Sequence, residues 1–199
     1  CFSISDSMST SGNVMRLAAE ELEASDRVTV INSANLSTGI GLQVIQAAIL
    51  SAEGKTRAQI TAAIEEIRPR VRASFVVDTL TYLYRGGRCN AVAALAGGML
   101  KLHPRIVVED GAMDASKKYR GKLASVILSY TKDMEEALKN AVPDRVFITH
   151  SGCDREIVES VRSYLESLGI FNEILETRAG GVVSSHCGPG TLGVLFIEK

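Results

Sequence analysis

Hydroxyl side chains gather near the amino end of the sequence, where they could bind an anion. Ser5–Gly12 reads S-D-S-M-S-T-S-G and lies between the strand-like Cys1–Ile4 and the helical pattern Val14–Leu22. Amide groups at the start of a helix, together with hydroxyls, suit a phosphate or a carboxylate. The same residue types also form ordinary helix caps and turns. From the residues alone, an anion site and a capping cluster are both open.

Two segments near the carboxyl end resemble catalytic motifs, but only in their letters. Gly188–Gly193 (G-P-G-T-L-G) matches the dinucleotide pattern, yet the few residues after Gly193 leave no room for the strand–helix–strand unit that it requires. A tight turn beside a ligand stays open. Ser184-Ser185-His186 lacks the G-x-S-x-G elbow of a serine hydrolase, and we expect Val182–Ser185 to be a strand. His186 is then expected to donate to an anion or to be satisfied in the core.

Two basic segments have an interpretation as binding sites and a simpler one. The glycines of Arg85–Asn90 (R-G-G-R-C-N) allow a close approach of ligand or partner, and its arginines could hold a carboxylate or phosphate. The simpler alternative is a turn that ends a helix. Lys117–Lys122 (K-K-Y-R-G-K) could dock an acidic partner or be a solvated face. The spacing of His103, His150 and His186 predicts no metal site.

Composition excludes several classes of protein. The chain has 199 residues, of which 46% are hydrophobic and 23% charged, and its net charge is −1. These proportions are those of a globular protein, and no block of like charge suggests nucleic-acid binding. We expect no membrane span, no secretory signal and no metal or organic cofactor. The four cysteines form no C-x-x-C pair, so a cytoplasmic protein with reduced thiols is expected.

Strand-like runs alternate with helical patterns, which predicts an α/β fold. We expect Gly41–Glu53, apolar around most of its circumference, to be a well-buried helix. Asp110-Gly111 predicts a hairpin turn, and the domain boundary is placed after residue 70. The remaining expected strands are Arg27–Asn32, Ser74–Val77, Arg145–His150, Phe171–Thr177 and Leu192–Ile197, and the remaining expected helices are Thr56–Arg68, Thr79–Tyr84, Asn90–Leu100, Gly121–Asn140 and Asp154–Leu168.

Four segments in order resemble the DegV family of bacterial fatty-acid-binding proteins. They are Ile4–Asn13 (I-S-D-S-M-S-T-S-G-N), Val30–Gly41 (V-I-N-S-A-N-L-S-T-G-I-G), Asp78–Arg88 (D-T-L-T-Y-L-Y-R-G-G-R) with Lys101–Gly111, and Ser185–Phe196 (S-H-C-G-P-G-T-L-G-V-L-F). The resemblance implies two α/β lobes, residues 1–70 with a parallel sheet and residues 71–199 with a mixed sheet. It further implies that a long acyl chain, such as palmitate, lies in a pocket between them.

The resemblance also implies which residues bind. The fatty-acid carboxylate would contact Ser9, Thr10, Ser11 and His186. The loops around the ligand would be formed by Gly86, Gly87, Arg88, Gly188 and Gly190. The chain would be a carrier, not an enzyme, which presents the bound acid to a separate kinase that phosphorylates the carboxylate with ATP. Arg120 is the candidate docking residue. Gly41–Glu53 and Ala91–Gly98 are candidates for the walls of the acyl tunnel.

Departures from the family pattern keep two alternatives open. The family's amino-terminal segment with its T-S-Q-P motif is not found, and the chain opens at Cys1, so we expect a truncated first lobe. Thr10 stands where the family has glycine, and Asn32 where it commonly has aspartate. One alternative is a partner-binding module with a vestigial pocket. The other is a phosphoryl-transfer or hydrolytic enzyme that uses Ser9, Thr10 and His186, although no P-loop or triad supports it.

Overall fold

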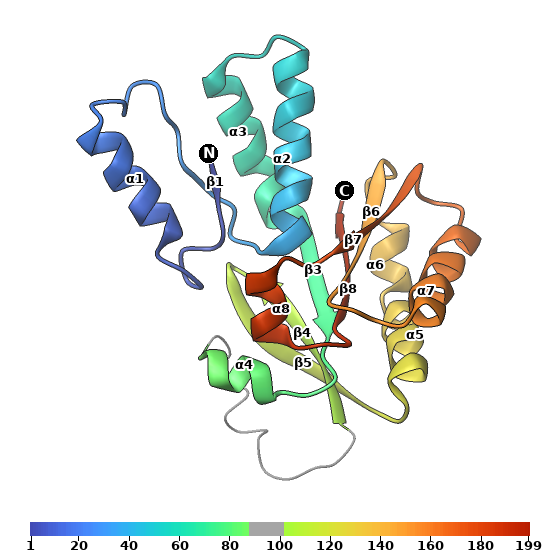
Figure 1. Ribbon diagram of the computed structural model, residues 1–199. Helices are drawn as coiled ribbons and strands as arrows, with labels where there is room; N and C mark the ends of the chain where they lie inside the picture. Colours follow the sequence, from blue (N-terminus) through green and yellow to red (C-terminus); the bar gives the residue numbers. More distant parts are fainter. Residues whose placement is uncertain (88–101) are drawn as a thin grey trace. The chain divides into compact units, whose positions relative to one another are not determined.

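The computed structural model describes residues 1–87 and 102–199, and its contacts divide the chain into two units (Figure 1). The first unit is Cys1–Val71 with the short segment Glu109–Ala112, and the second is Arg72–Val108 with Met113–Lys199. The boundary expected from the sequence lies after residue 70, and the place of Glu109–Ala112 in the first unit is not evident from the sequence. The expected helix Asn90–Leu100 and the expected tunnel wall Ala91–Gly98 lie outside the described residues.

The first unit is built around a short parallel pair of strands. β1 (Phe2–Ser3) pairs with β2 (Ile31–Asn32), with Phe2 opposite Ile31 and Ser3 opposite Asn32. Its helices are α1 (Ser11–Glu21), α2 (Ser37–Ala52) and α3 (Arg57–Ile67), and a 3₁₀ turn, Arg68–Arg70, follows α3. The parallel arrangement is as predicted. The strand expected over Arg27–Asn32 is reduced to its last two residues.

Helix α3 shows how local sequence sets the limits of an element. Thr56 accepts from the backbone of Gln59, whose side chain accepts from the backbone of Thr56, so a reciprocal capping box opens the helix. Ile64 on its inner face is fully buried. Pro69 in the following turn prevents the α-helix from continuing. The predicted span Thr56–Arg68 is therefore correct to within a residue or two.

Helix α2 is less buried than its composition predicts. Leu42 and Gln43 are buried, but Val44 is 43% exposed and Ile49 is 36% exposed, so the expected well-buried helix is wrong. Helix α1 likewise turns Val14 (60%) and Leu17 (57%) to the outside. The physical reason is that a sheet of two two-residue strands gives these helices little apolar surface to cover.

The second unit contains a six-stranded sheet in the order β5-β4-β3-β8-β6-β7 (Figure 1). The β3–β4 and β6–β8 pairs are antiparallel and β6–β7 is parallel, so the sheet is mixed. The α/β class, with a parallel first lobe and a mixed second lobe, is confirmed. The strands are β3 (Val71–Val76), β4 (Leu102–Glu109), β5 (Ala112–Arg120), β6 (Arg145–His150), β7 (Glu173–Arg178) and β8 (Leu192–Ile197).

Helices of the second unit are α4 (Thr81–Gly86), α5 (Leu123–Asp133), α6 (Glu135–Lys139), α7 (Arg155–Ser167) and α8 (Gly181–Cys187). The expected long helix Gly121–Asn140 is wrong as a single element, because the chain leaves α-geometry at Met134 and forms α5 and α6. The expected strand Val182–Ser185 is also wrong, since it lies in α8. Its β-branched valines favour a strand, but Gly180 in an extended conformation opens a short helix there.

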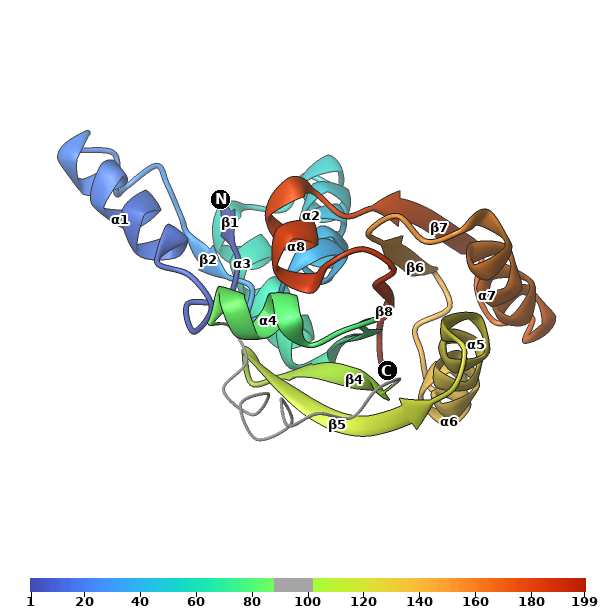
Figure 2. The ribbon, with the colours of Figure 1, turned by 60° about the horizontal axis from the view of Figure 1, so that its bottom comes forward.

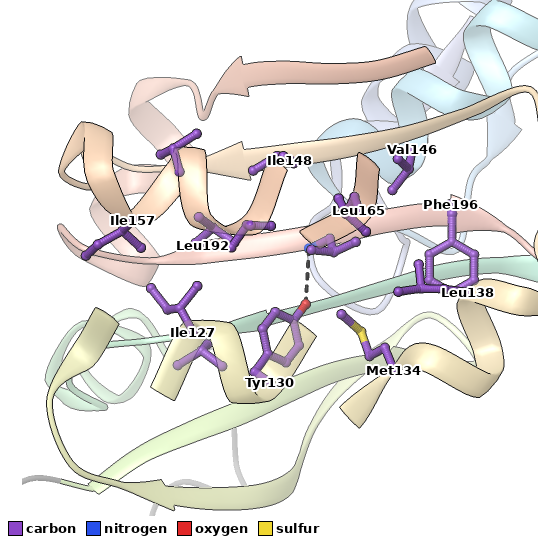
Figure 3. Close-up of a cluster of buried hydrophobic side chains, with 14 of the residues drawn as sticks. Ile127, Tyr130, Met134, Leu138, Val146, Ile148, Ile157, Leu165, Leu192 and Phe196 are labelled. Carbon is purple, nitrogen blue, oxygen red and sulfur yellow. Dashed lines mark hydrogen bonds between the residues drawn. The ribbon is translucent and has the colours of Figure 1, made fainter. Parts of the chain in front are cut away.

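The core of the second unit lies between α5–α7 and strands of the sheet (Figure 3). Ile157, Val158, Val161 and Leu165 on α7 are buried in it, as the spacing of apolar residues predicts. At its centre, the hydroxyl of Tyr130 donates to the carbonyl of Ser74 on β3 (2.7 Å) and accepts from the amide of Val194 on β8 (3.0 Å). Tyr130 thus ties α5 to two strands.

Candidate functional site

Hydroxyls line the loop that follows β1 in the first unit. The Oγ of Ser9 lies 2.7 Å from the Oγ of Ser11 and accepts from the amide of Ser11 at 3.2 Å. Thr10 between them is the N-cap of α1 and makes no side-chain capping bond. Both serines are partly exposed and Thr10 is exposed. The three hydroxyls that the sequence selects therefore lie together at the start of a helix, where amide groups also point outward.

Further serines brace this loop. Ser5 is buried, and its Oγ donates to the carbonyl of Gly111 at 2.6 Å; the Oγ of Ser7 donates to the same carbonyl. Gly12 packs so closely that a Cβ there would lie 2.9 Å from the Oγ of Ser3. Of the hydroxyls in Ser5–Ser11, those at positions 5 and 7 are thus used in holding the Asp110-Gly111 turn, while Ser9 and Ser11 bond to each other.

The loop before α2 lies at the same end of the parallel pair. Ala34 and Ser37 both adopt left-handed backbone conformations, with φ of 50° each, which is unusual for residues other than glycine. The amide of Leu36 donates to the side chain of Asn35, and Gln43 donates to the carbonyls of Ser33 and Gly39. The carboxyl ends of parallel strands are the ordinary place for ligands in such sheets.

Two segments far apart in the sequence meet in the second unit, where α4 lies beside α8 (Figure 2). A Cβ added at Gly86 would overlap Nδ1 of His186, and one added at Gly188 would overlap the ring of Tyr82. The glycines of the two segments are therefore required because the other segment's side chains occupy the space. The space left by Gly86 holds the ring of His186 on α8, and the space left by Gly188 holds the ring of Tyr82 on α4.

The turn after His186 is equally constrained. Gly188 and Gly190 have φ of 80° and 75°, conformations that glycine adopts without strain. A Cβ at Gly190 would lie 3.0 Å from Leu123 and 3.6 Å from Asp78. On the other segment, Gly87 ends α4 in the left-handed conformation (φ 65°), with open space around it. Gly86 and Gly188 thus face each other's segments at this junction, while Gly87 ends α4 beside it.

Other predicted residues have different surroundings. Arg88 lies outside the described residues. Arg120 is exposed at the end of β5, the edge strand of the sheet. The hydroxyl of Ser184 donates to the carbonyl of Ala179 (3.1 Å), and that of Ser185 donates to Val182 (2.8 Å), so both are engaged with the backbone of their own segment. The sequence analysis did not single out Tyr82 or Asp78, although both belong to the quoted D-T-L-T-Y-L-Y-R-G-G-R segment.

The candidate residues offer hydroxyl and amide groups at the start of α1 and the imidazole of His186. Within residues 1–87 and 102–199, no group of three or more His, Cys, Asp or Glu side chains could hold a metal ion. Burial raises the pKa of Cys187, which follows His186, to about 12, so this thiol is a poor nucleophile at neutral pH. Among the same residues, no helix is long and apolar enough to cross a membrane. What the described atoms offer is recognition of an acceptor such as a carboxylate.

Comparison with known proteins fixes the family. The family model described as "Uncharacterised protein, DegV family" matches residues 1–199. The chain belongs to the DegV family. A DegV domain-containing protein of Deinococcus radiodurans is 34% identical over 195 residues, which are 96% of this chain and 66% of that protein. The chain therefore spans just under two thirds of that relative's length.

Solved structures of DegV proteins have the same fold. A DegV family protein from Thermus thermophilus, whose structure is described as showing fatty acid binding, has a TM-score of 0.87 and 30% identity, with 98% of this chain and 69% of that chain covered. The Streptococcus pneumoniae fatty acid kinase B3 protein, solved with linoleic acid, has a TM-score of 0.84 at 17% identity, covering 100% and 70%. At that identity the second likeness shows the fold alone.

Proposed function

We propose that this DegV chain binds a long-chain fatty acid and presents its carboxylate to a partner kinase. The observation that carries the proposal is the α4–α8 junction, where Gly86 leaves just enough space for His186. The family resemblance implies that this histidine contacts the fatty-acid carboxylate. The similar DegV protein from Thermus thermophilus is described as binding fatty acid. A ring fixed by packing loses little entropy when it binds, so it suits a ligand with a single charged group.

In this proposal the candidate donors to the carboxylate are hydroxyl, amide and imidazole groups. Ser9, Thr10 and Ser11 supply hydroxyls and the amides at the start of α1, and His186 supplies an imidazole N–H. A hydrogen bond to a charged group contributes about 1.5–3 kcal/mol, so two or three such bonds suffice to orient the head group. Gly188 and Gly190, with their positive φ angles, shape the turn that follows His186. No cofactor is required by this function.

Neighbouring glycines provide a matched test of the role of His186. In Gly86→Ala the new methyl group overlaps the imidazole, whereas in Gly87→Ala it meets open space and adds only the strain of a positive φ. We expect Gly86→Ala to weaken binding of palmitate at least about tenfold, and Gly87→Ala to lower stability by about 1 kcal/mol while binding is retained. If the two folded variants bind palmitate equally well, His186 does not take part in binding.

The kinase is proposed to dock on the basic end of β5. Lys118, Arg120 and Lys122 are exposed there, while Lys117 lies 2.6 Å from Asp133 and over the ring of Tyr119. The name of the Streptococcus pneumoniae protein supports a kinase as partner for this fold. With a cognate fatty acid kinase and ATP, Arg120→Glu should slow acyl-phosphate formation while palmitate binding stays normal. An unchanged rate would place docking elsewhere.

A further inference from the structure

His103 on β4 is a buried histidine, and both of its ring nitrogens face acceptors. Its Nε2 is 3.1 Å from the carbonyl oxygen of Gly121, and its Nδ1 is 3.4 Å from Oδ1 of Asp78. The side chain is 7% exposed. Among the described residues, Nδ1 has no hydrogen-bond partner, so the Asp78 carboxylate is a close polar contact. The buried Nδ1 therefore lies in close polar contact with a carboxylate oxygen, while Nε2 is hydrogen-bonded to the backbone.

Asp78 connects this pair to the α4–α8 junction. It follows β3 in the short segment that leads into α4, which carries Tyr82 and Gly86. Its Cβ also lies 3.6 Å from the point where a Cβ of Gly190 would be, in the turn after His186. One carboxylate side chain therefore touches His103, begins the segment before α4 and borders the turn after α8.

The backbone beside His103 continues this connection. The amide of Val77 donates to the carbonyl of Pro104 at 3.3 Å, so the last ladder bond between β3 and β4 lies next to both His103 and Asp78. Beyond it the chain leaves the sheet. The His103–Asp78 contact thus lies where the backbone pairing of β3 with β4 ends and the chain continues to α4.

We propose that His103 is a positioning residue for His186, acting through its contact with Asp78. The pair holds the entry to α4 and the Gly188–Gly190 turn, and these in turn fix the imidazole against Gly86. The consequence for ligand affinity rests on the proposed function, whereas the effect on the orientation of His186 does not. A merely structural His103 would affect stability without altering the surroundings of His186.

The chain has three histidines, so their ring signals can be resolved by NMR in the ligand-free protein. The main variant is Asp78→Asn, which preserves the volume of a half-exposed side chain. Two further variants change the histidine itself, His103→Gln and His103→Leu. The matched control is Glu176→Gln, which removes the carboxylate that lies 3.5 Å from His150. We expect the His186 signal to move in the first three variants and to stay in the control, with a smaller shift in His103→Gln, which keeps a donor.

Binding of the fluorescent fatty acid cis-parinaric acid gives the second readout. Its dissociation constant should rise about tenfold in Asp78→Asn and His103→Leu, and stay constant in Glu176→Gln. A His186 signal that stays in place in folded Asp78→Asn and His103→Leu would overturn the proposal. If the unaltered protein binds no parinaric acid, the proposed function fails, but the His186 signal still decides the role of His103.

Discussion

The two units hold their candidate residues on very different frames. In the first unit the hydroxyls Ser9 and Ser11 follow a strand of two residues. Leu17 on the nearby helix α1 is 57% exposed, and Leu22 just after that helix is 74% exposed. In the second unit, which has a six-stranded sheet and a continuous apolar core, His186 lies on α8 against Gly86 of α4. The difference indicates that the imidazole is held by the close approach of two segments, α4 and α8, and the hydroxyl loop by a network of local hydrogen bonds.

A fully buried leucine and a highly exposed one should show the largest difference in their effect on the free energy of unfolding. Leu165→Ala removes a fully buried side chain from the core of the second unit and should lower the free energy of unfolding by about 2–5 kcal/mol. Leu22→Ala, at a 74% exposed position of the first unit, should change it by less than about 0.5 kcal/mol. Urea denaturation of both variants measures this. Comparable losses would mean that the first unit has a core as dense as the second.

Tyr130→Phe is expected to have the next largest effect. The variant keeps the ring but leaves the carbonyl of Ser74 and the amide of Val194 without their partner, in a fully buried place. We expect a loss of about 2–3 kcal/mol in thermal or urea unfolding. Tyr84→Phe, at a ring that is 58% exposed, serves as control and should have almost no effect. A negligible loss in Tyr130→Phe would show that water or strand movement replaces the bonds.

Thr56→Ala tests the local contribution in the first unit. It removes the hydroxyl of the capping box at the start of α3 and should cost about 1 kcal/mol. Because the cap stabilises α3 alone, hydrogen exchange should rise in α3 more than in α7. Faster exchange spread evenly over both helices would contradict the division into separately stabilised units.

Glu176 on β7 predicts a small dependence of stability on pH. A hydrogen bond from Arg162 lowers the pKa of its carboxyl below the ordinary value of 4.5, with Arg155 and His150 adding to the effect. The ionised form therefore stabilises the fold above about pH 4.5, and this contribution is lost as pH falls through the lower folded pKa. The difference in melting temperature between the unaltered chain and Glu176→Gln should shrink at acid pH. A constant difference would argue against the ion pair.

Elements with strong local signals could be predicted from the sequence. The apolar spacing of Ile157, Val161 and Leu165 gave α7, and Asp110-Gly111 gave the hairpin turn, where both residues have positive φ. The strand predicted at Val182–Ser185 failed because β-branched residues carry a weak preference that the local backbone overrode. The burial predicted for Gly41–Glu53 failed because exposure depends on what the rest of the unit offers as a surface.

For the candidate site, residue types could be predicted but contacts could not. A run of hydroxyls before a helix marked Ser9 and Ser11, and the structure places them in contact. The fit of His186 against Gly86, and of Tyr82 against Gly188, depends on two segments that meet only in the folded second unit. No local sequence pattern shows which distant side chain will lie against a glycine. The glycines could therefore be noticed in the sequence, but not the rings that pack against them.

The central claim is tested most directly by mass spectrometry of lipid bound to the protein. The protein is incubated with palmitate, separated from free acid, extracted with solvent and compared with Ser9→Ala/His186→Ala. The control is Ser185→Ala, because the hydroxyl of Ser185 donates to the backbone of its own helix. We predict about one long-chain fatty acid per chain in the unaltered protein and in the control, and loss in the double variant. Absence of bound acid from the unaltered protein, or equal retention in the folded double variant, would contradict the account.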